Sequence, residues 1–277
     1  MKPSLTVIFI TLNEEFHIGE AIDNVKDIAE EVFVVDSLSS DRTVDIALEK
    51  GAKVVQRPFK NFGDQWNFAL DKLPIKTAWT MKMDPDERLR DDLKSELRKC
   101  LSECGRASGY SFFRVLWFMG KCLPGVKNEV VRVWRTGRCR FSDVLVNEHP
   151  IVEGRVFRLH GLMDHFDSKD LSHWWEKQNK YTSAEALMRL RGDVLAAEPK
   201  FFGSSLERRM WFKKIFFHIP CRYAIFSVLL FFVKGAWRSG IDGWRWVKCR
   251  QMVMRLREYK YIEMKRLRDS SESTLAK

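Results

Sequence analysis

Residues 5–36 read LTVIFITLNEEFHIGEAIDNVKDIAEEVFVVD, a stretch in which two apolar runs flank a segment with helical spacing. The first run, residues 5–10, has the length and continuous apolar character of a parallel strand that is covered on both faces. The apolar residues between positions 18 and 28 recur at intervals of three and four, which predicts a helix over residues 15–29 with one buried face. Residues 32–35 form the second apolar run, which ends at Asp36. We therefore predict a strand, a helix and a second strand, the repeating unit of a parallel sheet.

This alternation continues to residue 83. A polar loop at residues 37–40 precedes a helix that ends at Gly51, and a strand at 53–55, a helix at 66–73 and a strand at 78–83 follow. The order predicts a doubly wound α/β domain with a mostly parallel sheet, whose ligands bind beyond the carboxyl ends of the strands. Asn13, Asp36 and Asp84 follow three of these strands, so we expect them at one edge of the sheet.

Three carboxylates, Asp84, Asp86 and Glu87, leave the end of the strand at 78–83. Carboxylates this close repel one another unless a cation lies among them, and Mg²⁺ and Mn²⁺ prefer oxygen ligands. We predict that Asp84 and Asp86 hold Mg²⁺ or Mn²⁺, which would bind a diphosphate. An Asp-Pro-Asp segment is also an ordinary turn after a strand. Its place beside the other polar strand ends favours the metal site.

The composition is that of a folded protein. A chain of 277 residues with 45% hydrophobic and 13% aromatic residues can form one large or two modest domains and is not disordered. The first twelve residues lead into a strand pattern and lack the form of a signal peptide, so we expect a cytosolic protein. The six cysteines show no paired CxxC spacing, which fits reduced thiols.

Positive charge is concentrated near the C-terminus. Residues 200–268 contain 17 Lys and Arg against 4 Asp and Glu, whereas the rest of the chain has a slight negative balance. Such a region indicates an anionic partner, and the candidates are nucleic acid, a membrane surface or an anionic substrate.

The chain carries a series of short motifs: Thr11-Leu-Asn-Glu14, Val35-Asp-Ser37, Ser40-Asp-Arg-Thr43, Arg57-Pro-Phe59, Gln65-Trp-Asn67, Met83-Asp-Pro-Asp-Glu87, Arg132-Val-Trp-Arg135, Asn147-Glu148, His165 and Lys177-Gln-Asn-Lys-Tyr181. In this order and spacing they resemble family 2 inverting glycosyltransferases of the GT-A fold. The resemblance covers roughly residues 4–190 and is strongest to the branch that includes bacterial lipopolysaccharide core β-glucosyltransferases.

The resemblance implies a transfer of sugar from a UDP-sugar. Asp36 would accept a hydrogen bond from the uracil ring, a charge-assisted contact, although a strand-end Asp can also cap its own loop. The other residues implied in nucleotide-sugar binding are Thr11, Asn13, Glu14, Gln65, Asn67, Asp84, Arg132 and Arg135. The two arginines are candidates for phosphate contacts because a guanidinium matches phosphate oxygens, or they are solvated arginines at a strand end. The metal would stabilise the charge that develops on the leaving diphosphate.

An inverting transfer also needs a base that removes the proton of the acceptor hydroxyl. Glu148 matches the family's carboxylate base. Relatives commonly carry His before this Glu, whereas here Asn147 precedes it and His149 follows, so His149 is a second candidate. An ordinary surface Glu-His pair is the alternative. Lys82 also departs from the family pattern, and its role stays open.

The C-terminal region, from residue 170, has the pattern of long helices. Cation pairs alternate with aromatic and aliphatic runs over residues 205–238, and residues 224–233 are apolar apart from one serine. Ten residues are half of the roughly 20 that a helix needs to span a bilayer, so we expect no transmembrane span. A basic surface rich in Phe and Trp is typical of a helix in the membrane interface, with core packing as the alternative.

We therefore predict a GT-A catalytic domain at residues 1–169 and a helical, basic, membrane-associating region at 170–277. The activity would be metal-dependent transfer of a hexose, which the resemblance implies to be glucose, from a UDP-sugar to a lipid-anchored saccharide such as lipopolysaccharide core. The enzyme would lie at the cytoplasmic face of a bacterial inner membrane, on an anionic surface, with no nucleic-acid partner. The alternatives are a non-catalytic protein and a nucleotidyltransferase-like protein whose basic tail binds nucleic acid or membrane.

Overall fold

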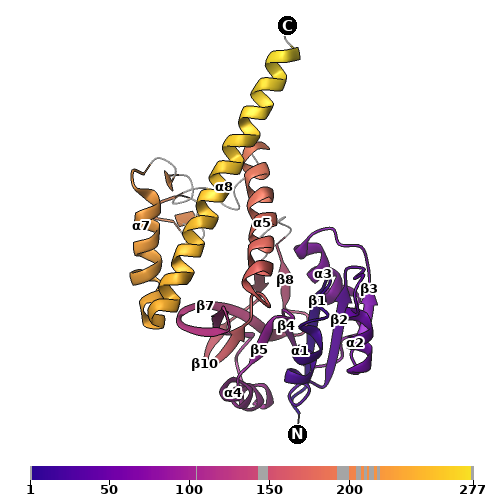
Figure 1. The fold of residues 1–277 in the computed structure, drawn as a ribbon. Helices are drawn as coiled ribbons and strands as arrows, with labels where there is room; N and C mark the ends of the chain where they lie inside the picture. Colours follow the sequence, from indigo (N-terminus) through magenta and orange to yellow (C-terminus); the bar gives the residue numbers. More distant parts are fainter. Residues whose placement is uncertain are drawn as a thin grey trace. The chain divides into compact units, whose positions relative to one another are not determined.

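The computed structural model describes residues 2–103, 105–142, 149–191, 200–203, 207–208, 211, 215–216 and 219–275. Glu148, the predicted base, lies outside these residues. The chain divides into two compact units, of which the first comprises Met1–Trp117 and Lys127–Asp167 and the second Phe118–Val126 and Ser168–Lys277. The first unit contains the strands that position the candidate site (Figure 1).

The first unit is built on an eight-stranded sheet in the order β3-β2-β1-β4-β7-β6-β10-β5. The strands are β1 (Leu5–Thr11), β2 (Glu31–Asp36), β3 (Lys53–Gln56), β4 (Trp79–Met83), β5 (Glu87–Leu89), β6 (Gly109–Phe118), β7 (Lys121–Arg135) and β10 (Val156–His165). The strands β1 to β4 run parallel to one another, whereas β7 is antiparallel to β4, and β5 is antiparallel to β10. The sheet is therefore mixed, and its parallel half is the part with helical crossovers. β8 (Cys139–Phe141) and β9 (Pro150–Val152) form a separate pair.

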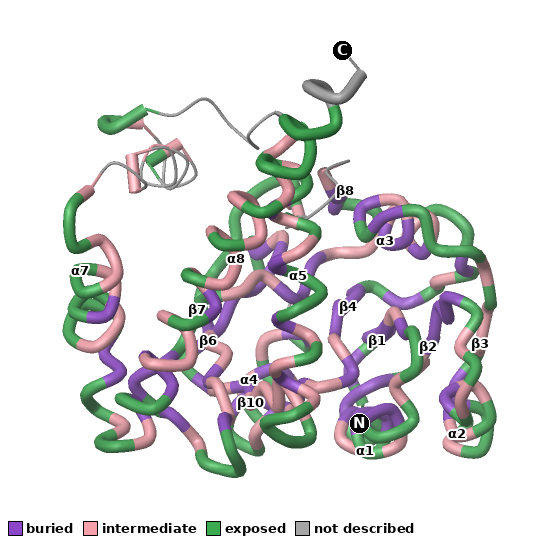
Figure 2. Tube along the Cα trace, turned by 45° about the horizontal axis from the view of Figure 1, so that its top comes forward, coloured by how far each residue is buried: buried purple, intermediate pink, exposed green. Residues whose placement is uncertain are grey.

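Helices cover both faces of the parallel half. α1 (Ile18–Val25) and α2 (Thr43–Glu49) pack on the face of β1 that carries Val7 and Phe9, and α4 (Asp91–Ser102) packs against β10 in the same buried cluster. α3 (Phe62–Lys72) packs on the opposite face, against Ile8. Since side chains alternate along a strand, the continuous apolar run of β1 supplies both layers. Figure 2 shows the resulting band of buried residues through β1, β2 and β4. The arrangement is the doubly wound one that the sequence predicts.

The boundaries of the predicted helices differ from those observed. The helix predicted over residues 15–29 is α1, Ile18–Val25, with turns on either side. The helix predicted from residue 66 starts earlier, at Phe62, because the side chain of Asn61 accepts a hydrogen bond from the Asp64 amide at 2.7 Å and caps it. Apolar spacing locates the buried face of a helix, whereas a capping residue sets its start.

The second unit contains α5 (Leu171–Arg191), α7 (Arg222–Val228), the π-helix η2 (Leu229–Val233), the 3₁₀-helix η3 (Ala236–Ser239) and α8 (Gly240–Leu275). α8 packs against α5, where Arg257 Nη1 lies 2.8 Å from Glu185 Oε2, and against α7, where Arg222 Nη2 lies 2.6 Å from Glu258 Oε1. Because Phe118–Val126 also belongs to the second unit, the chain passes between the units more than once, and the domain bounds predicted at residues 169 and 170 stay a prediction. The roles predicted for the two domains stay predictions.

No single helix among the described residues is both long and apolar enough to cross a membrane. Two segments, Arg222–Val233 and Ala236–Ser271, reach the required length and composition only when they are taken together, and they are bent by 70° relative to each other.

Candidate active site

Asp36 lies at the carboxyl end of β2, opposite Thr11 of β1 in the parallel register. Its Oδ1 accepts hydrogen bonds from Thr11 Oγ1 at 2.8 Å and Ser39 Oγ at 2.5 Å. Its Oδ2 accepts from the Ser39 amide at 2.8 Å and from Gln56 Nε2 at 3.1 Å. A carboxylate has about four acceptor positions, so all of them are occupied in this arrangement.

These hydrogen bonds stabilise the ionised form of Asp36. Burial alone would raise its pKa, but the donors on Ser39, Gln56 and Thr11 outweigh burial and lower the pKa below the ordinary 3.8. Asp36 thereby holds the loop that follows β2. A direct contact from Asp36 to a uracil ring would require one of these hydrogen bonds to open.

The loops after β1 and β2 are joined by further hydrogen bonds. Asn13 adopts a left-handed conformation with φ 55°, which asparagine tolerates better than most residues. Its Oδ1 accepts from the Ser40 amide at 2.9 Å, and the Glu14 amide donates to Thr43 Oγ1 at 2.7 Å. The two loops therefore form one polar surface at the edge predicted to bind a nucleoside.

Gln65 and Asn67, both on α3, have different surroundings. Gln65 is buried, its Nε2 donates to Ser37 Oγ at 3.2 Å, and its Oε1 has no hydrogen-bond donor among the described residues. Asn67 donates to the Phe141 carbonyl and accepts from the Phe141 amide, both at 3.0 Å. Gln65 thus faces the loop after β2, whereas Asn67 fastens β8 to α3. These two hydrogen bonds use one donor and one acceptor of the Asn67 amide, and its predicted nucleotide-sugar contact stays a prediction.

Two arginines neutralise the carboxylates that follow β4. Arg132, on β7, is buried, and its Nη2 contacts both Asp84 Oδ2, at 2.7 Å, and Glu87 Oε1. Arg114, on β6, lies 2.9 Å from Glu87 Oε1 and 3.8 Å from Asp84 Oδ2. Glu87 also accepts a hydrogen bond from the Asp84 amide at 3.0 Å. The predicted phosphate residue Arg132 is thus at the site, bound to its carboxylates.

The arginine charges set the protonation of Asp84. Burial would raise the pKa of Asp84, but the charges of Arg132, Lys82 and Arg114 outweigh burial and the repulsion of Asp86, and the pKa falls to about 2. The same carboxylates raise the pKa of the Arg132 guanidinium against the opposing effect of burial. Asp84 and Arg132 are therefore both ionised at neutral pH.

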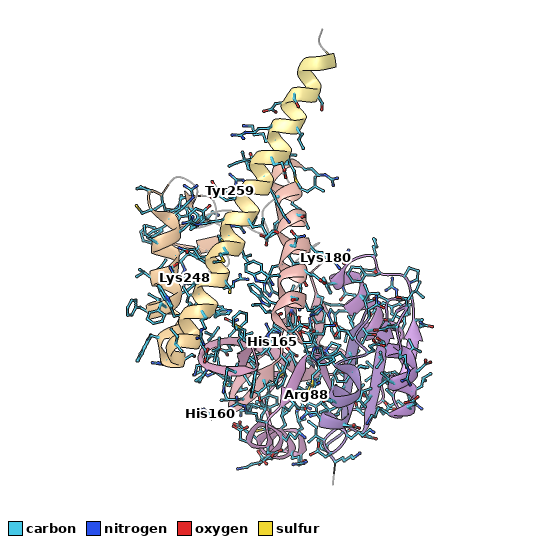
Figure 3. The ribbon with its side chains drawn as sticks, viewed as in Figure 1. Arg88, His160, His165, Lys180, Lys248 and Tyr259 are labelled. Atoms are coloured by element: carbon cyan, nitrogen blue, oxygen red, sulfur yellow. The ribbon has the colours of Figure 1, made fainter. Side chains whose placement is uncertain are left out.

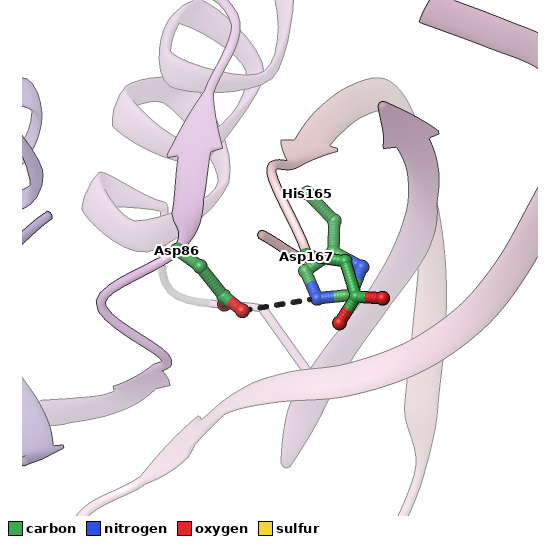
Figure 4. A group of neighbouring side chains, drawn as sticks. All are labelled: Asp86, His165 and Asp167. Carbon is green, nitrogen blue, oxygen red and sulfur yellow. Dashed lines mark ion pairs between the residues drawn. The ribbon is translucent and has the colours of Figure 1, made fainter. Parts of the chain in front are cut away.

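Asp86 lies beside His165 and Asp167 (Figure 4). Asp86 Oδ2 lies 3.3 Å from His165 Nε2, and one ligand atom from each of the three residues lies within 4.8 Å of the others. Backbone pairing explains the contact, since His165 pairs with Glu87 in the antiparallel β10·β5 ladder and the Phe166 amide donates to the Asp86 carbonyl at 2.8 Å. Figure 3 shows His165 and Arg88 in this part of the first unit.

The Asp86, His165 and Asp167 side chains fit a divalent cation. Carboxylate oxygens suit Mg²⁺ and Mn²⁺, and imidazole is a common metal ligand. The structure thus separates the predicted pair, because Asp84 pairs with Arg132 while Asp86 joins this group. The roles of Asp167 and His165 could not be predicted from the sequence, since only the pairing of β10 with β5 brings them to Asp86.

The structure places Arg135, a predicted phosphate residue, away from the carboxylates that follow β4. β7 runs antiparallel to β4, so Arg135 pairs with Trp79 at the amino end of β4, away from Asp84. There its guanidinium lies 4.4 Å from the Trp79 ring centroid and donates to the Ala107 and Gly105 carbonyls. The two arginines of the Arg132-Val-Trp-Arg135 motif therefore lie in different places, and only Arg132 reaches the candidate site.

Two further residues can be placed. Lys82 is buried on the α3 side of β4, with Nζ 4.6 Å from the Trp66 ring centroid and 5.3 Å from that of Phe141. This placement against aromatic rings accounts for a lysine in an otherwise apolar strand. His149 is exposed, and its amide donates to Ser142 Oγ at 3.4 Å. The assignment of the base to Glu148 or His149 stays a prediction.

Comparison with known proteins agrees with the motifs. The model of glycosyl transferase family 2 matches residues 6–109. An uncharacterised glycosyltransferase of Rickettsia typhi is 28% identical over 239 residues, which cover 80% of this chain and 79% of the relative. The lipopolysaccharide core biosynthesis glycosyltransferase LpsC of Rhizobium meliloti is 27% identical over 255 residues, which cover 87% and 86%.

Among solved structures, the mannosyltransferase PcManGT of Pyrobaculum calidifontis, in complex with GDP-Man and Mn²⁺, aligns with a TM-score of 0.51 and 16% identity. The alignment covers 95% of this chain and 88% of that one, and it shows a shared fold. The predicted resemblance to family 2 glycosyltransferases, including lipopolysaccharide core enzymes, is confirmed.

Proposed function

We propose that this family 2 glycosyltransferase moves a hexose, which we take to be glucose, from a UDP-sugar to a saccharide carried on a lipid. The observation that carries the proposal is the group formed by Asp86, His165 and Asp167 at the edge where α/β sheets bind ligands. A lipopolysaccharide core enzyme among the relatives supports an acceptor of that class or a related surface glycan.

The nucleoside would lie over the joined loops after β1 and β2, against Thr11, Asn13, Glu14 and Asp36. The diphosphate would lie near Asp84 and Arg132. Arg132 is suited to this role because its guanidinium lies 2.7 Å from Asp84, and its planar fork matches phosphate oxygens.

Asp86, His165 and Asp167 would hold the divalent ion, and Asp84 stays a predicted fourth ligand. When bound, Mg²⁺ or Mn²⁺ stabilises the negative charge of the leaving diphosphate. The two arginines beside Asp84 would stabilise the same charge from the protein side.

In the proposed step, an acceptor hydroxyl oxygen forms a bond to the anomeric carbon while the bond from that carbon to the diphosphate oxygen breaks. UDP leaves with the bonding electron pair, and the hydroxyl proton passes to Glu148, or to His149 if the register differs. Attack from the face opposite the diphosphate inverts the anomeric centre.

The lipid-anchored acceptor motivates a location at the cytoplasmic face of a bacterial inner membrane. The excess of 13 positive charges over residues 200–268 supports attraction to an anionic surface. Each cation near an anionic leaflet contributes about 1 kcal/mol, so a few cations engaged together bind substantially.

The proposal is tested by calorimetry with Mn²⁺ and a panel of UDP-sugars, with GDP-mannose for comparison. We expect metal-dependent binding of a UDP-hexose, lost in Asp86→Asn and in His165→Gln. Asp45→Asn, which changes an exposed carboxylate on α2, is the matched control and should bind as the parent does. Equal affinity in all proteins with and without Mn²⁺ would refute the proposed site.

A further inference from the structure

The second unit exposes a concentrated group of apolar side chains where α7 and η2 turn back through η3 into α8. We call residues 222–244 the hairpin (Figure 1). Its exposed large apolar side chains are Ile225, Val228, Leu229, Phe232, Val233, Trp237, Ile241 and Trp244. Single exposed apolar residues are ordinary, whereas a contiguous group marks an interaction site.

A groove of about 350 Å³ lies within this group, between α7 with η2 and the first turns of α8. Its lining residues are Ala224, Ser227, Val228, Phe231, Phe232, Trp244, Lys248 and Gln251. The groove volume is at the lower end of the roughly 300–1,000 Å³ of small-molecule sites. Phe231 and Trp244 contact each other edge to face, with ring centroids 5.4 Å apart, and join the two sides of the groove.

The polar side chains of the groove differ in whether they already donate a hydrogen bond to the backbone. Ser227 Oγ and Gln251 Nε2 both donate to the Tyr223 carbonyl, at 3.0 and 2.9 Å. Among the described lining residues Lys248 is the charged one, and its Nζ lies 4.4 Å from the Trp244 ring centroid. Figure 3 shows Lys248 on the stretch of α8 beside α7. The groove therefore offers an apolar surface and one cation, which match a hydrocarbon chain with an anionic head.

We propose that the hairpin enters one leaflet of an anionic membrane and that the groove takes one acyl chain of a phospholipid, whose phosphate meets Lys248. The depth to which the hairpin enters the membrane follows from the length of its first helical segment. The segment Arg222–Val233 is about 18 Å long as a helix, against a hydrocarbon core of about 30 Å, so it reaches into one leaflet without crossing the bilayer.

A membrane fits this surface better than a protein partner. The hairpin contains three cations and one acid, and Asp242 is already paired with Arg245 at 2.8 Å. Protein interfaces are depleted in lysine at their cores, whereas Trp beside Lys or Arg is typical of the boundary between lipid and water. The inference rests on the proposed membrane location and adds the inserting residues and a lipid site.

The first test measures partition of the full chain onto phosphatidylcholine vesicles that contain phosphatidylglycerol, in 1 M salt, where the Debye length is about 3 Å. Phe232→Gln should lower the partition coefficient about tenfold, which corresponds to about 1.4 kcal/mol. Leu267→Gln on the far part of α8 is the matched control, since Leu267 and Phe232 are 64% and 63% exposed. Equal effects of the two substitutions would overturn insertion by the hairpin.

The second test uses phosphatidylglycerol with brominated chains, which quench tryptophan fluorescence on contact. The contributions of Trp237 and Trp244 are obtained by subtracting Trp237→Phe and Trp244→Phe spectra from the parent spectrum. Ala224→Phe, which fills the groove with apolar atoms, should keep vesicle binding and the quenching of Trp237 but reduce the quenching of Trp244 at least twofold. Unchanged quenching of Trp244 would overturn the acyl site.

The result of these two membrane tests can be distinguished from the result of a test of the proposed sugar transfer. Turnover of a UDP-sugar in solution, without vesicles, reports the first unit and should be equal in parent and Phe232→Gln. If binding to anionic vesicles is sensitive to salt but Phe232→Gln has no effect, the protein docks by electrostatic attraction alone. That result would overturn insertion of the hairpin.

Discussion

Glu87→Gln tests whether one buried carboxylate holds the acidic strand end together. Glu87 has no exposed surface, and it pairs with Arg114, Arg132 and the Asp84 amide. Glutamine keeps the shape but removes the charge, so the buried Arg132 is left with Asp84 as its carboxylate partner among the described residues. Breaking a buried ion pair by removing one partner costs about 3–5 kcal/mol. Because Asp84 remains, we expect a loss of about 3 kcal/mol in the free energy of unfolding.

The assay is thermal and urea unfolding of the full chain followed by tryptophan fluorescence. A loss of this size should lower Tm by roughly 6–12 °C for a chain of this length. Glu49→Gln is the matched control, since Glu49 pairs with Arg42 at 3.4 Å and both side chains are about two thirds exposed. The control should lose no more than about 0.5 kcal/mol. If Glu87→Gln costs no more than the control, the reasoning about the buried cluster is wrong.

Three further predictions concern the site. Arg132→Lys keeps the charge but loses the planar fork, so it should weaken UDP binding about tenfold by calorimetry, whereas Arg135→Lys should leave it unchanged; the opposite ranking would restore Arg135 to the site. Glu148→Gln should slow sugar transfer by about 10²–10⁴ with donor binding retained, and if His149→Ala has that effect instead, His149 is the base. Because the pKa of Asp36 is lower in the folded than in the unfolded state, its ionised form stabilises the fold fully above about pH 3.8. This contribution is lost as the pH falls through the pKa of the folded state. Asp36→Asn should therefore flatten the acid limb of the stability curve, and an unchanged limb would contradict the assignment.

Local sequence determined the N-terminal half of the fold and the place of the site. The parallel strands and their two covering layers were predicted from the apolar runs of β1, β2 and β4 and from the helical spacing between these runs. This was possible because the buried face of a strand or helix is set by the spacing of apolar residues that are near one another in the sequence. The same order of elements put Asp36 and Asp84 at one sheet edge. Motif spacing predicted the family.

Only the tertiary structure decided which side chains meet at that edge. Arg132 and Arg135 lie in one motif, yet the antiparallel direction of β7 sends them to different ends of β4. His165 and Asp167 reach Asp86 through the pairing of β10 with β5. Strand direction and register depend on packing between segments that are far apart in the chain, and no local period encodes them. The sequence by itself thus determined the elements and the resemblance to family 2 glycosyltransferases, and the pairing of distant strands decided the partners of each charged residue.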